Sequence, residues 1–179
     1  IPAGLWCYRI DRKRLIIGGA LSDGGNLYAW LKKHLKLSKD AEEQIAKRKP
    51  GAHGLTFLPF LHGERSTGYN ESATGGVLGL TSATDSIDIL QAALESVAYK
   101  FAEIFNQLNK VVKIKEIFAS GGALRDSPVW TQIIADVIGS DLLLNNATES
   151  SSRGAVMFAT EKLTTDDLMS DSFDVKMCI

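Results

Sequence analysis

The hydrophobic positions along the chain fall into two patterns, short apolar runs and longer stretches with helical spacing. The clearest helix is predicted over residues 86–110, because its apolar side chains recur every three or four positions and form one continuous stripe. Asp85 can cap this helix, and Asp88 places a negative charge in the first turn, where the helix dipole favours it. The stripe consists of Ile87, Leu90, Leu94, Val97, Phe101, Ile104 and Leu108.

The first part of the chain predicts a hairpin followed by two helices. Residues 5–10 and 15–17 are apolar or β-branched runs separated by a charged turn, which is typical of an antiparallel hairpin. Helical spacing then follows a glycine-rich stretch at 18–25. A second, more charged helix is predicted at 38–48, because Ser38 can cap it and a proline follows shortly after its end.

The rest of the chain alternates strands, loops and helices. One helix has clear start and stop signals, with Ser127 as its cap, Pro128 at its first position and Gly139 at its end. The other predicted elements are a buried strand at 55–61, a polar loop at 63–76, strands at 116–120 and 141–145, a loop at 121–126 and a last helix at 155–163. This order predicts a mixed α/β domain in which helices cover a sheet.

Composition and charge narrow the class of protein. The chain of 179 residues fits one domain, and 45% apolar with 23% charged residues is usual for a soluble globular protein. The net charge of −1 gives no reason to expect nucleic acid or an anionic membrane as a partner. Cys7 and Cys178 lie at opposite ends without a zinc-site pattern, which favours a reducing, cytoplasmic compartment. Because the chain starts at Ile1 without a leader pattern, we expect a piece of a longer protein.

The three histidines form no catalytic pattern in the sequence. His34 lies in a lysine-rich helical stretch, and His53 and His62 flank an apolar run. A histidine that acts as a base needs an orienting partner, and none is evident from the sequence. We therefore interpret all three as surface or loop histidines.

Two glycine-rich turns are the candidates for chemistry. Gly19 and Gly24 have the spacing of a phosphate-binding loop, but Gly25-Asn26 stands where that motif requires Lys followed by Ser or Thr. The second turn, residues 121–126, follows a strand and opens a helix, but it lacks the third glycine of a dinucleotide motif. Each turn alone is equally well explained as a tight strand-to-helix connection. Two such turns in one domain favour phosphate or nucleotide binding.

Three segments in a fixed order resemble the FGGY family of carbohydrate kinases. Residues 75–80 (GGVLGL), followed after seven residues by 88–95 (DILQAALE), resemble the second signature of that family. Residues 57–66 (FLPFLHGERS) resemble its apolar strand ending in Gly-Glu-Arg, and 120–130 (SGGALRDSPVW) resemble its adenine-binding turn and helix. The resemblance implies a ribonuclease H-like domain of the actin and hexokinase type over residues 1–163. Residues 164–179 would then be a tail or a terminal helix.

The resemblance implies where a nucleotide binds. Gly25 falls at the family's phosphate-side glycine, and its neighbours Gly24 and Asn26 are expected to offer backbone N–H groups. Ala29 stands where the glycerol kinase branch has a glutamine, so a side-chain contact is not expected there.

The second turn corresponds to the adenosine side of the same site. Gly121 and Gly122 form the turn, and Gly122 and Asp126 fall at positions that line the adenine and ribose. Ser127 is expected both to cap the following helix and to lie beside the nucleotide. We interpret Glu64 and Arg65 chiefly as a structural pair near a domain interface.

The resemblance also implies the reaction, an in-line transfer of the ATP γ-phosphate, with Mg²⁺, to a sugar hydroxyl. The family's catalytic Asp and most of its sugar contacts lie in an N-terminal domain of the same polypeptide, so no catalytic residue is expected in this chain. Asp23, Asp85, Asp126 and Asp136 are better explained as turn, cap or helix residues. The isolated chain should bind nucleotide weakly at most and should not turn over. A homodimer is an open alternative, and neither nucleic acid nor membrane is an expected partner.

The choice of sugar rests on two local features. The glycine-rich stretch at 18–25 followed by Trp30-Leu31, and the length of the adenine loop, resemble the gluconate kinase branch. Xylulose, ribulose or glycerol are the alternatives within the family. A hypothesis of another class is a non-catalytic nucleotide-binding module with the same fold.

Overall fold

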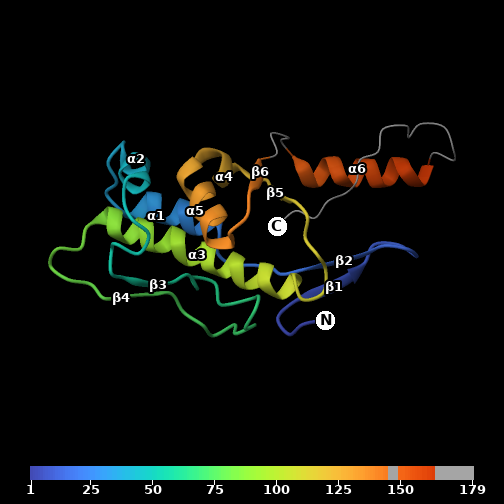
Figure 1. The fold of residues 1–179 in the computed structure, drawn as a ribbon, viewed down its shortest axis with the longest axis horizontal. Helices are drawn as coiled ribbons and strands as arrows, with labels where there is room; N and C mark the ends of the chain where they lie inside the picture. Colours follow the sequence, from blue (N-terminus) through green and yellow to red (C-terminus); the bar gives the residue numbers. More distant parts are fainter. Residues whose placement is uncertain (145–148, 164–179) are drawn as a thin grey trace.

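A computed structural model describes residues 1–144 and 149–163 of the chain (Figure 1). The predicted tail at 164–179 and the last residue of the strand predicted at 141–145 lie outside the described residues. No helix of the described part is long and apolar enough to cross a membrane.

Helix α3 (Ser86–Leu108) runs through the middle of the molecule (Figure 1). Helices α1 (Gly25–His34), α2 (Ala41–Ala46) and α5 (Pro128–Ile138) pack against it, and strand β3 (Thr56–Leu58) packs against it as well. Every residue of α3 from 90 to 98 is buried, so this part of the helix is covered on all sides and not only along the predicted apolar stripe.

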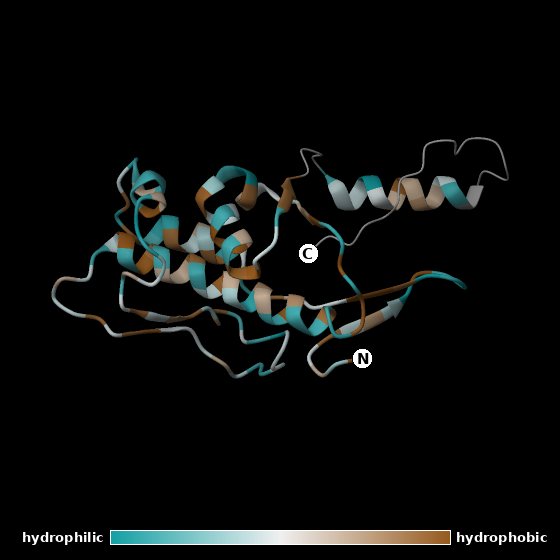
Figure 2. Cartoon of the chain, viewed as in Figure 1, coloured by the Kyte–Doolittle hydropathy of each residue, from teal (hydrophilic) through white to brown (hydrophobic). Residues whose placement is uncertain are grey.

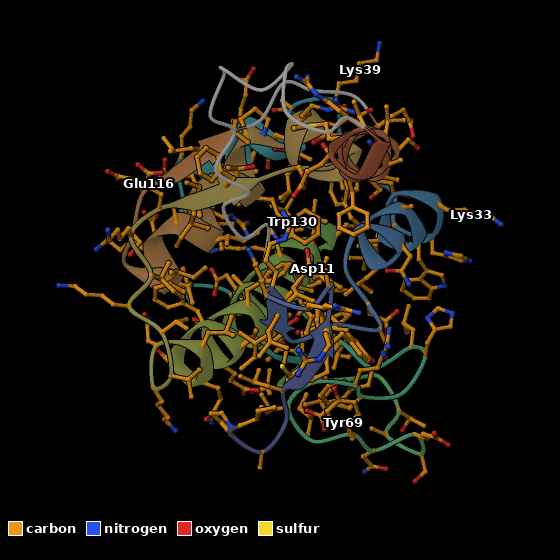
Figure 3. The ribbon with its side chains drawn as sticks, turned by 90° about the vertical axis from the view of Figure 1, so that its right-hand side faces the viewer. Asp11, Lys33, Lys39, Tyr69, Glu116 and Trp130 are labelled. Atoms are coloured by element: carbon orange, nitrogen blue, oxygen red, sulfur yellow. The ribbon has the colours of Figure 1, made fainter. Side chains whose placement is uncertain are left out.

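Small side chains explain why this helix is buried all round. Ala92, Ala93 and Ala98 are at most 3% exposed and add little bulk between the stripe residues. Neighbouring elements can therefore approach the helix from several sides at once. Trp130 of α5 fills the space between helices, and its Nε1–H donates to the Leu94 carbonyl oxygen at 3.2 Å. Figure 3 shows this ring near the centre of the molecule, with labelled charged residues such as Lys33 and Glu116 at the periphery.

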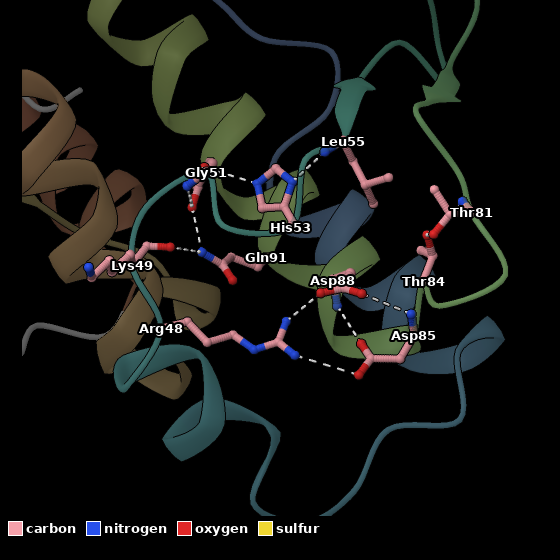
Figure 4. A network of polar contacts seen from close by, with 11 residues as sticks. Arg48, Lys49, Gly51, His53, Leu55, Thr81, Thr84, Asp85, Asp88 and Gln91 are labelled. Atoms are coloured by element: carbon pink, nitrogen blue, oxygen red, sulfur yellow. Dashed lines mark hydrogen bonds and ion pairs between the residues drawn. The ribbon is translucent and has the colours of Figure 1, made fainter.

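The first turn of α3 carries the predicted cap in full. Asp85 accepts a hydrogen bond from the Asp88 N–H at 2.8 Å, and Asp88 accepts one from the Asp85 N–H at 2.9 Å. This capping box satisfies two amides that the helix ladder leaves unpaired. Arg48 forms ion pairs with both carboxylates, at 2.6 Å to Asp88 and 3.5 Å to Asp85 (Figure 4). The amide of Asp85 and the guanidinium of Arg48 lower the pKa of Asp88.

The described strands form three two-stranded sheets and not the single mixed sheet of the prediction. The pairs are antiparallel β1 (Trp6–Arg9) with β2 (Leu15–Gly18), antiparallel β3 with β4 (Gly76–Leu78), and parallel β5 (Ile117–Ala119) with β6 (Leu142–Leu144). Strands of three or four residues make few ladder hydrogen bonds. The β3–β4 pair is connected to the helices by the packing of β3 on α3. The charged hairpin turn between β1 and β2 is hydrophilic, as predicted (Figure 2).

Several elements differ from the prediction in their bounds or type. Helix α2 is shorter than 38–48, because Asp40 is its N-cap residue and the Ser38 hydroxyl instead accepts from Gln44 Nε2 at 3.1 Å. Strand β3 covers only part of 55–61, and its partner β4 begins where the polar loop was expected to end. The predicted loop at 121–126 contains the short helix α4 (Gly122–Asp126).

The C-terminal elements follow the predicted signals more closely. Ser127 caps α5, Pro128 opens it, and Gly139 ends it with a left-handed φ of 71°. Helix α6 (Ser150–Leu163) begins earlier than the predicted 155–163. It contacts the hairpin turn through Arg14, which pairs with Glu161 at 3.0 Å and lies 5.5 Å from the ring centre of Phe158.

Candidate functional site

The two glycine-rich turns meet in space. Gly25 begins α1, and Ala123 lies in the first turn of α4. A Cβ atom on Gly25 would lie only 3.1 Å from the Ala123 Cβ, so the close approach of the two turns favours glycine at this position. The structure thus brings together the phosphate-side and adenosine-side residues that the resemblance implies.

The first turn is organised by Asp23 and Asn26. The Asp23 side chain is fully buried and accepts from Asn26 Nδ2 at 2.9 Å. Asn26 Oδ1 in turn accepts from the Gly24 N–H at 2.7 Å. This bond corrects the expectation that Gly24 offers a free N–H group, because that group is already paired within the turn.

The amides available to an anion lie one residue further along. The first helical hydrogen bond of α1 runs from the Tyr28 N–H to the Gly24 carbonyl oxygen at 3.2 Å. The amides of Gly25, Asn26 and Leu27 therefore precede the helical ladder, and α1 has no side-chain cap. An uncapped helix start with a positive dipole end favours a phosphate group.

The second turn leaves room for a ligand close to its backbone. Gly121 has a φ of 123°, a conformation that side chains rarely adopt, and both Gly121 and Gly122 are exposed. A Cβ on Gly24, Gly121 or Gly122 would have no atom within 4 Å. Packing within the described chain does not require glycine at these three positions, whereas a ligand lying against the backbone would. Asp126, at the end of α4, is exposed on the same turn.

Ser127 confirms the cap prediction but does not face a ligand. Its side chain is fully buried, accepts from the Trp130 N–H at 3.3 Å and donates to the Glu42 carboxylate at 2.7 Å and 2.9 Å. Glu42 also accepts from the Tyr28 hydroxyl at 2.6 Å. Burial and the neighbouring Glu42 carboxylate raise the pKa of Tyr28 to about 12. Ser127 therefore holds the start of α5 to α2 and α1 and does not contact the nucleotide through its hydroxyl.

Glu64 and Arg65 are not a pair. The Glu64 carboxylate binds Lys100 Nζ at 2.6 Å, and Lys100 also pairs with Glu103. No described carboxylate lies within ion-pair distance of the Arg65 guanidinium, and Arg65 is exposed. Glu64 is thus bound to α3 through Lys100, and a role of both residues near a domain interface stays a prediction.

Two of the three histidines have partners that the sequence did not reveal. His53 is buried between Glu95, whose Oε2 lies 3.2 Å from Nε2, and the Leu55 N–H, which donates to Nδ1 at 2.9 Å (Figure 4). His62 is held by Asp23, with 2.7 Å between Nδ1 and Oδ1. Both histidines lie in loops, as interpreted, and His62 is exposed, but the His53 side chain is buried and each has an orienting carboxylate that the sequence did not reveal. His34 bonds within its own helix, through the Trp30 carbonyl oxygen at 2.8 Å, and it is exposed as expected.

One of the two larger pockets of the described chain lies at the first of these turns. Gly24, Gly25 and Asn26 line a pocket of about 400 Å³ together with residues of β2 and α3. A second pocket of about 510 Å³ lies between α2, α3 and α5 and contains none of the predicted site residues. We place the candidate site at the first pocket and the adjoining second turn, because the unpaired amides lie there. No group of three potential metal ligands occurs among the described residues.

Comparison with known proteins identifies relatives that match most of the chain. Gluconokinase from Bacillus licheniformis is 32% identical over 185 residues, which cover 93% of this chain and 36% of that protein. Glycerol kinase from Aquifex aeolicus is 33% identical over 147 residues, covering 80% of this chain and 30% of that protein. The chain therefore spans about a third of the length of these relatives.

A solved structure shows the same fold. The crystal structure of ligand-bound xylulose kinase from Lactobacillus acidophilus superposes with a TM-score of 0.76 at 24% identity, over 89% of this chain and 33% of that one. This likeness confirms the predicted α/β fold class of the actin and hexokinase type. Residues 7–161 match the model of the FGGY family of carbohydrate kinases, C-terminal domain. The chain thus belongs to the FGGY family of carbohydrate kinases and corresponds to the C-terminal domain of that family.

Proposed function

We propose that this chain is the ATP-binding, C-terminal half of a carbohydrate kinase that transfers the ATP γ-phosphate to a hydroxyl group of a sugar or sugar acid. The observation that carries the proposal is the contact between the two glycine turns, at Gly25 and Ala123, within a chain of this family. An N-terminal domain of the same polypeptide completes the active site. The cytoplasmic location and the homodimer stay predictions.

In this proposal the two turns bind different parts of the nucleotide. The amides of Gly25 and Asn26, which are exposed residues, donate to phosphate oxygens at the positive end of α1. The backbone at Gly121 and Gly122 lies against the adenosine, with Asp126 within reach of the ribose. Mg²⁺ would accompany the phosphates and neutralise part of their charge.

The base that accepts the hydroxyl proton comes from outside this chain. Asp23 is buried and bonded to three donors, and Asp85 is occupied as a cap. Asp126 and Asp136 are surface residues of α4 and α5, and Asp136 is bonded to Gln132. Phosphoryl transfer depends mainly on positioning and on charge stabilisation, and this domain supplies the positioning of the nucleotide.

We propose gluconate as the acceptor. The gluconokinase relative matches 93% of the chain, and the stretch from Gly18 to Gly25 with Trp30-Leu31 has the form seen in the gluconate branch. Xylulose, ribulose and glycerol are the alternatives. A coupled assay of ADP release by the full-length protein, with each of these four acceptors in turn, decides among them. ATP binding without turnover on any acceptor would instead favour a non-catalytic nucleotide-binding module.

A single substitution tests the nucleotide site. Gly122→Val places a branched side chain where the adenosine is proposed to lie, and its Cβ meets no protein atom. We expect the unfolding temperature to change little and ATP binding, measured by calorimetry, to be lost. Gly154→Val in α6 is the matched control, because a Cβ there also meets no atom. Equal ATP affinity of the two variants and the wild type would show that the site is wrongly placed.

A further inference from the structure

His62 and Asp23 form a hydrogen-bonded pair beside the first glycine turn. The Asp23 side chain is fully buried and accepts three hydrogen bonds. These come from His62 Nδ1 at 2.7 Å, from the His62 backbone N–H at 2.9 Å and from Asn26 Nδ2 at 2.9 Å. The carboxylate therefore fixes both the backbone and the ring of His62.

The contacts determine which ring nitrogen is free. A carboxylate with three donors can only accept, so the proton of the His62–Asp23 bond belongs to Nδ1. No described residue lies within hydrogen-bond distance of Nε2, and the side chain of His62 is 67% exposed. An exposed imidazole held at one nitrogen by a buried carboxylate presents the other nitrogen in a fixed direction.

The bonded side of the ring, at Nδ1, lies next to Asn26 on the phosphate side of the candidate site. Asn26 Nδ2 is 3.5 Å from His62 Nδ1, and the same Asn26 side chain binds the Gly24 amide that precedes α1. His62 and Asn26 thus bind the same carboxylate, that of Asp23, and Asn26 also shapes the first glycine turn. Packing gives little reason for an imidazole here, because most of the ring is in solvent and the His62 N–H alone already ties the β3–β4 loop to Asp23.

We propose that His62 contacts the terminal phosphate of ATP through Nε2, and that Asp23 is its positioning residue. The proposal rests on the proposed kinase function. In its protonated form the ring donates through Nδ1 to Asp23 and through Nε2 to a phosphate oxygen, next to the amides of Gly25 and Asn26. The contact adds a charge-assisted hydrogen bond to a group that ATP has and ADP lacks.

Two substitutions of His62 distinguish the role of Nδ1 from that of Nε2. The amide nitrogen of His62→Asn falls near the position of Nδ1, so this variant keeps the bond to Asp23 and removes Nε2. The amide nitrogen of His62→Gln falls near Nε2, so it restores a donor there without the bond to Asp23. The measurement is calorimetric titration of the full-length protein with ATP and with ADP, without acceptor, together with kcat and KM for ATP and the unfolding temperature.

We expect His62→Asn to bind ATP about tenfold more weakly, which corresponds to about 1.4 kcal/mol. ADP affinity should stay within about twofold of the wild type, the unfolding temperature should not change, and His62→Gln should recover part of the ATP affinity. Unchanged ATP affinity in His62→Asn, or an equal loss for ATP and ADP, would overturn this inference and leave the proposed function intact. A wild-type protein that binds neither nucleotide would overturn the proposed function, and the inference with it.

Discussion

Removal of one buried hydroxyl should destabilise the junction of three helices. Ser127 is fully buried, and its oxygen both caps α5 at the Trp130 N–H and donates to Glu42. In Ser127→Ala the Trp130 amide loses its side-chain acceptor, and Glu42 keeps only the hydrogen bond from Tyr28 among its described donors at this junction. The variant tests whether the hydrogen bonds of the Ser127 hydroxyl contribute to the free energy of unfolding.

The expected magnitude follows from the two interactions. Loss of a serine N-cap costs about 1 kcal/mol. Loss of a hydrogen bond to a charged group costs about 1.5–3 kcal/mol, but both effects involve one oxygen atom and overlap. We therefore expect the free energy of unfolding to fall by about 2–3 kcal/mol, and the unfolding temperature by roughly 5–10 °C for a chain of this size.

Urea denaturation and calorimetric melting measure the effect, with Ser38→Ala as the control. Ser38 is exposed and accepts a hydrogen bond from Gln44 at 3.1 Å, so its removal should change stability by no more than about 0.5 kcal/mol. Because the Ser127 hydroxyl does not face the candidate site, ATP affinity of folded Ser127→Ala should match the wild type. A stability loss below about 0.5 kcal/mol would refute the role of the Ser127–Glu42 contact.

Two further predictions concern pH and the backbone. The pKa of the Tyr28 phenol is raised to about 12. The neutral phenol therefore makes its full contribution to the free energy of unfolding below the ordinary tyrosine pKa of about 10, and this contribution is lost as the pH rises toward 12. Burial also raises the pKa of Tyr99, so absorbance titration should show more than one late-ionising tyrosine, and Tyr28→Phe should have one fewer. An unchanged titration would contradict the burial of Tyr28. Gly63 has a φ of 74°, and a Cβ there would lie 2.8 Å from the Glu71 carbonyl oxygen, so Gly63→Ala should lower the free energy of unfolding by about 1–3 kcal/mol in urea. Gly154→Ala, in the middle of α6, should instead raise it by about 0.5–1 kcal/mol, and equal effects of the two changes would argue against the described loop geometry.

The sequence predicts best those elements whose ends are encoded locally. Helix α3 begins at its predicted cap because Asp85 and Asp88 bond each other's amides. Helix α5 has a cap, a proline and a terminal glycine within its own segment. In contrast, strand β4 has only three residues and begins at the second glycine of a pair. Its pairing with β3 is a tertiary contact that no local pattern encodes.

The same distinction between local signals and tertiary contacts applies to the residues of the candidate site. The glycine turns at Gly25 and Gly122 could be found because glycine is informative wherever a backbone is approached closely. The partners of His62 and Ser127 could not be found, because Asp23 and Glu42 lie far from them in the sequence. One signal was present for Asp23, since a carboxylate directly before the Gly24-Gly25 turn is a natural acceptor for loop amides, but it does not specify a histidine.

The buried middle of α3 has a consequence for how the domain moves. Its amides between residues 90 and 98 are shielded on every side, so they should be among the last to exchange with deuterium, and only through global opening. Helices α1 and α5, which lie after the two glycine turns, both pack against α3. We therefore expect the spacing of the two turns to be set by the fold of this domain before any nucleotide binds.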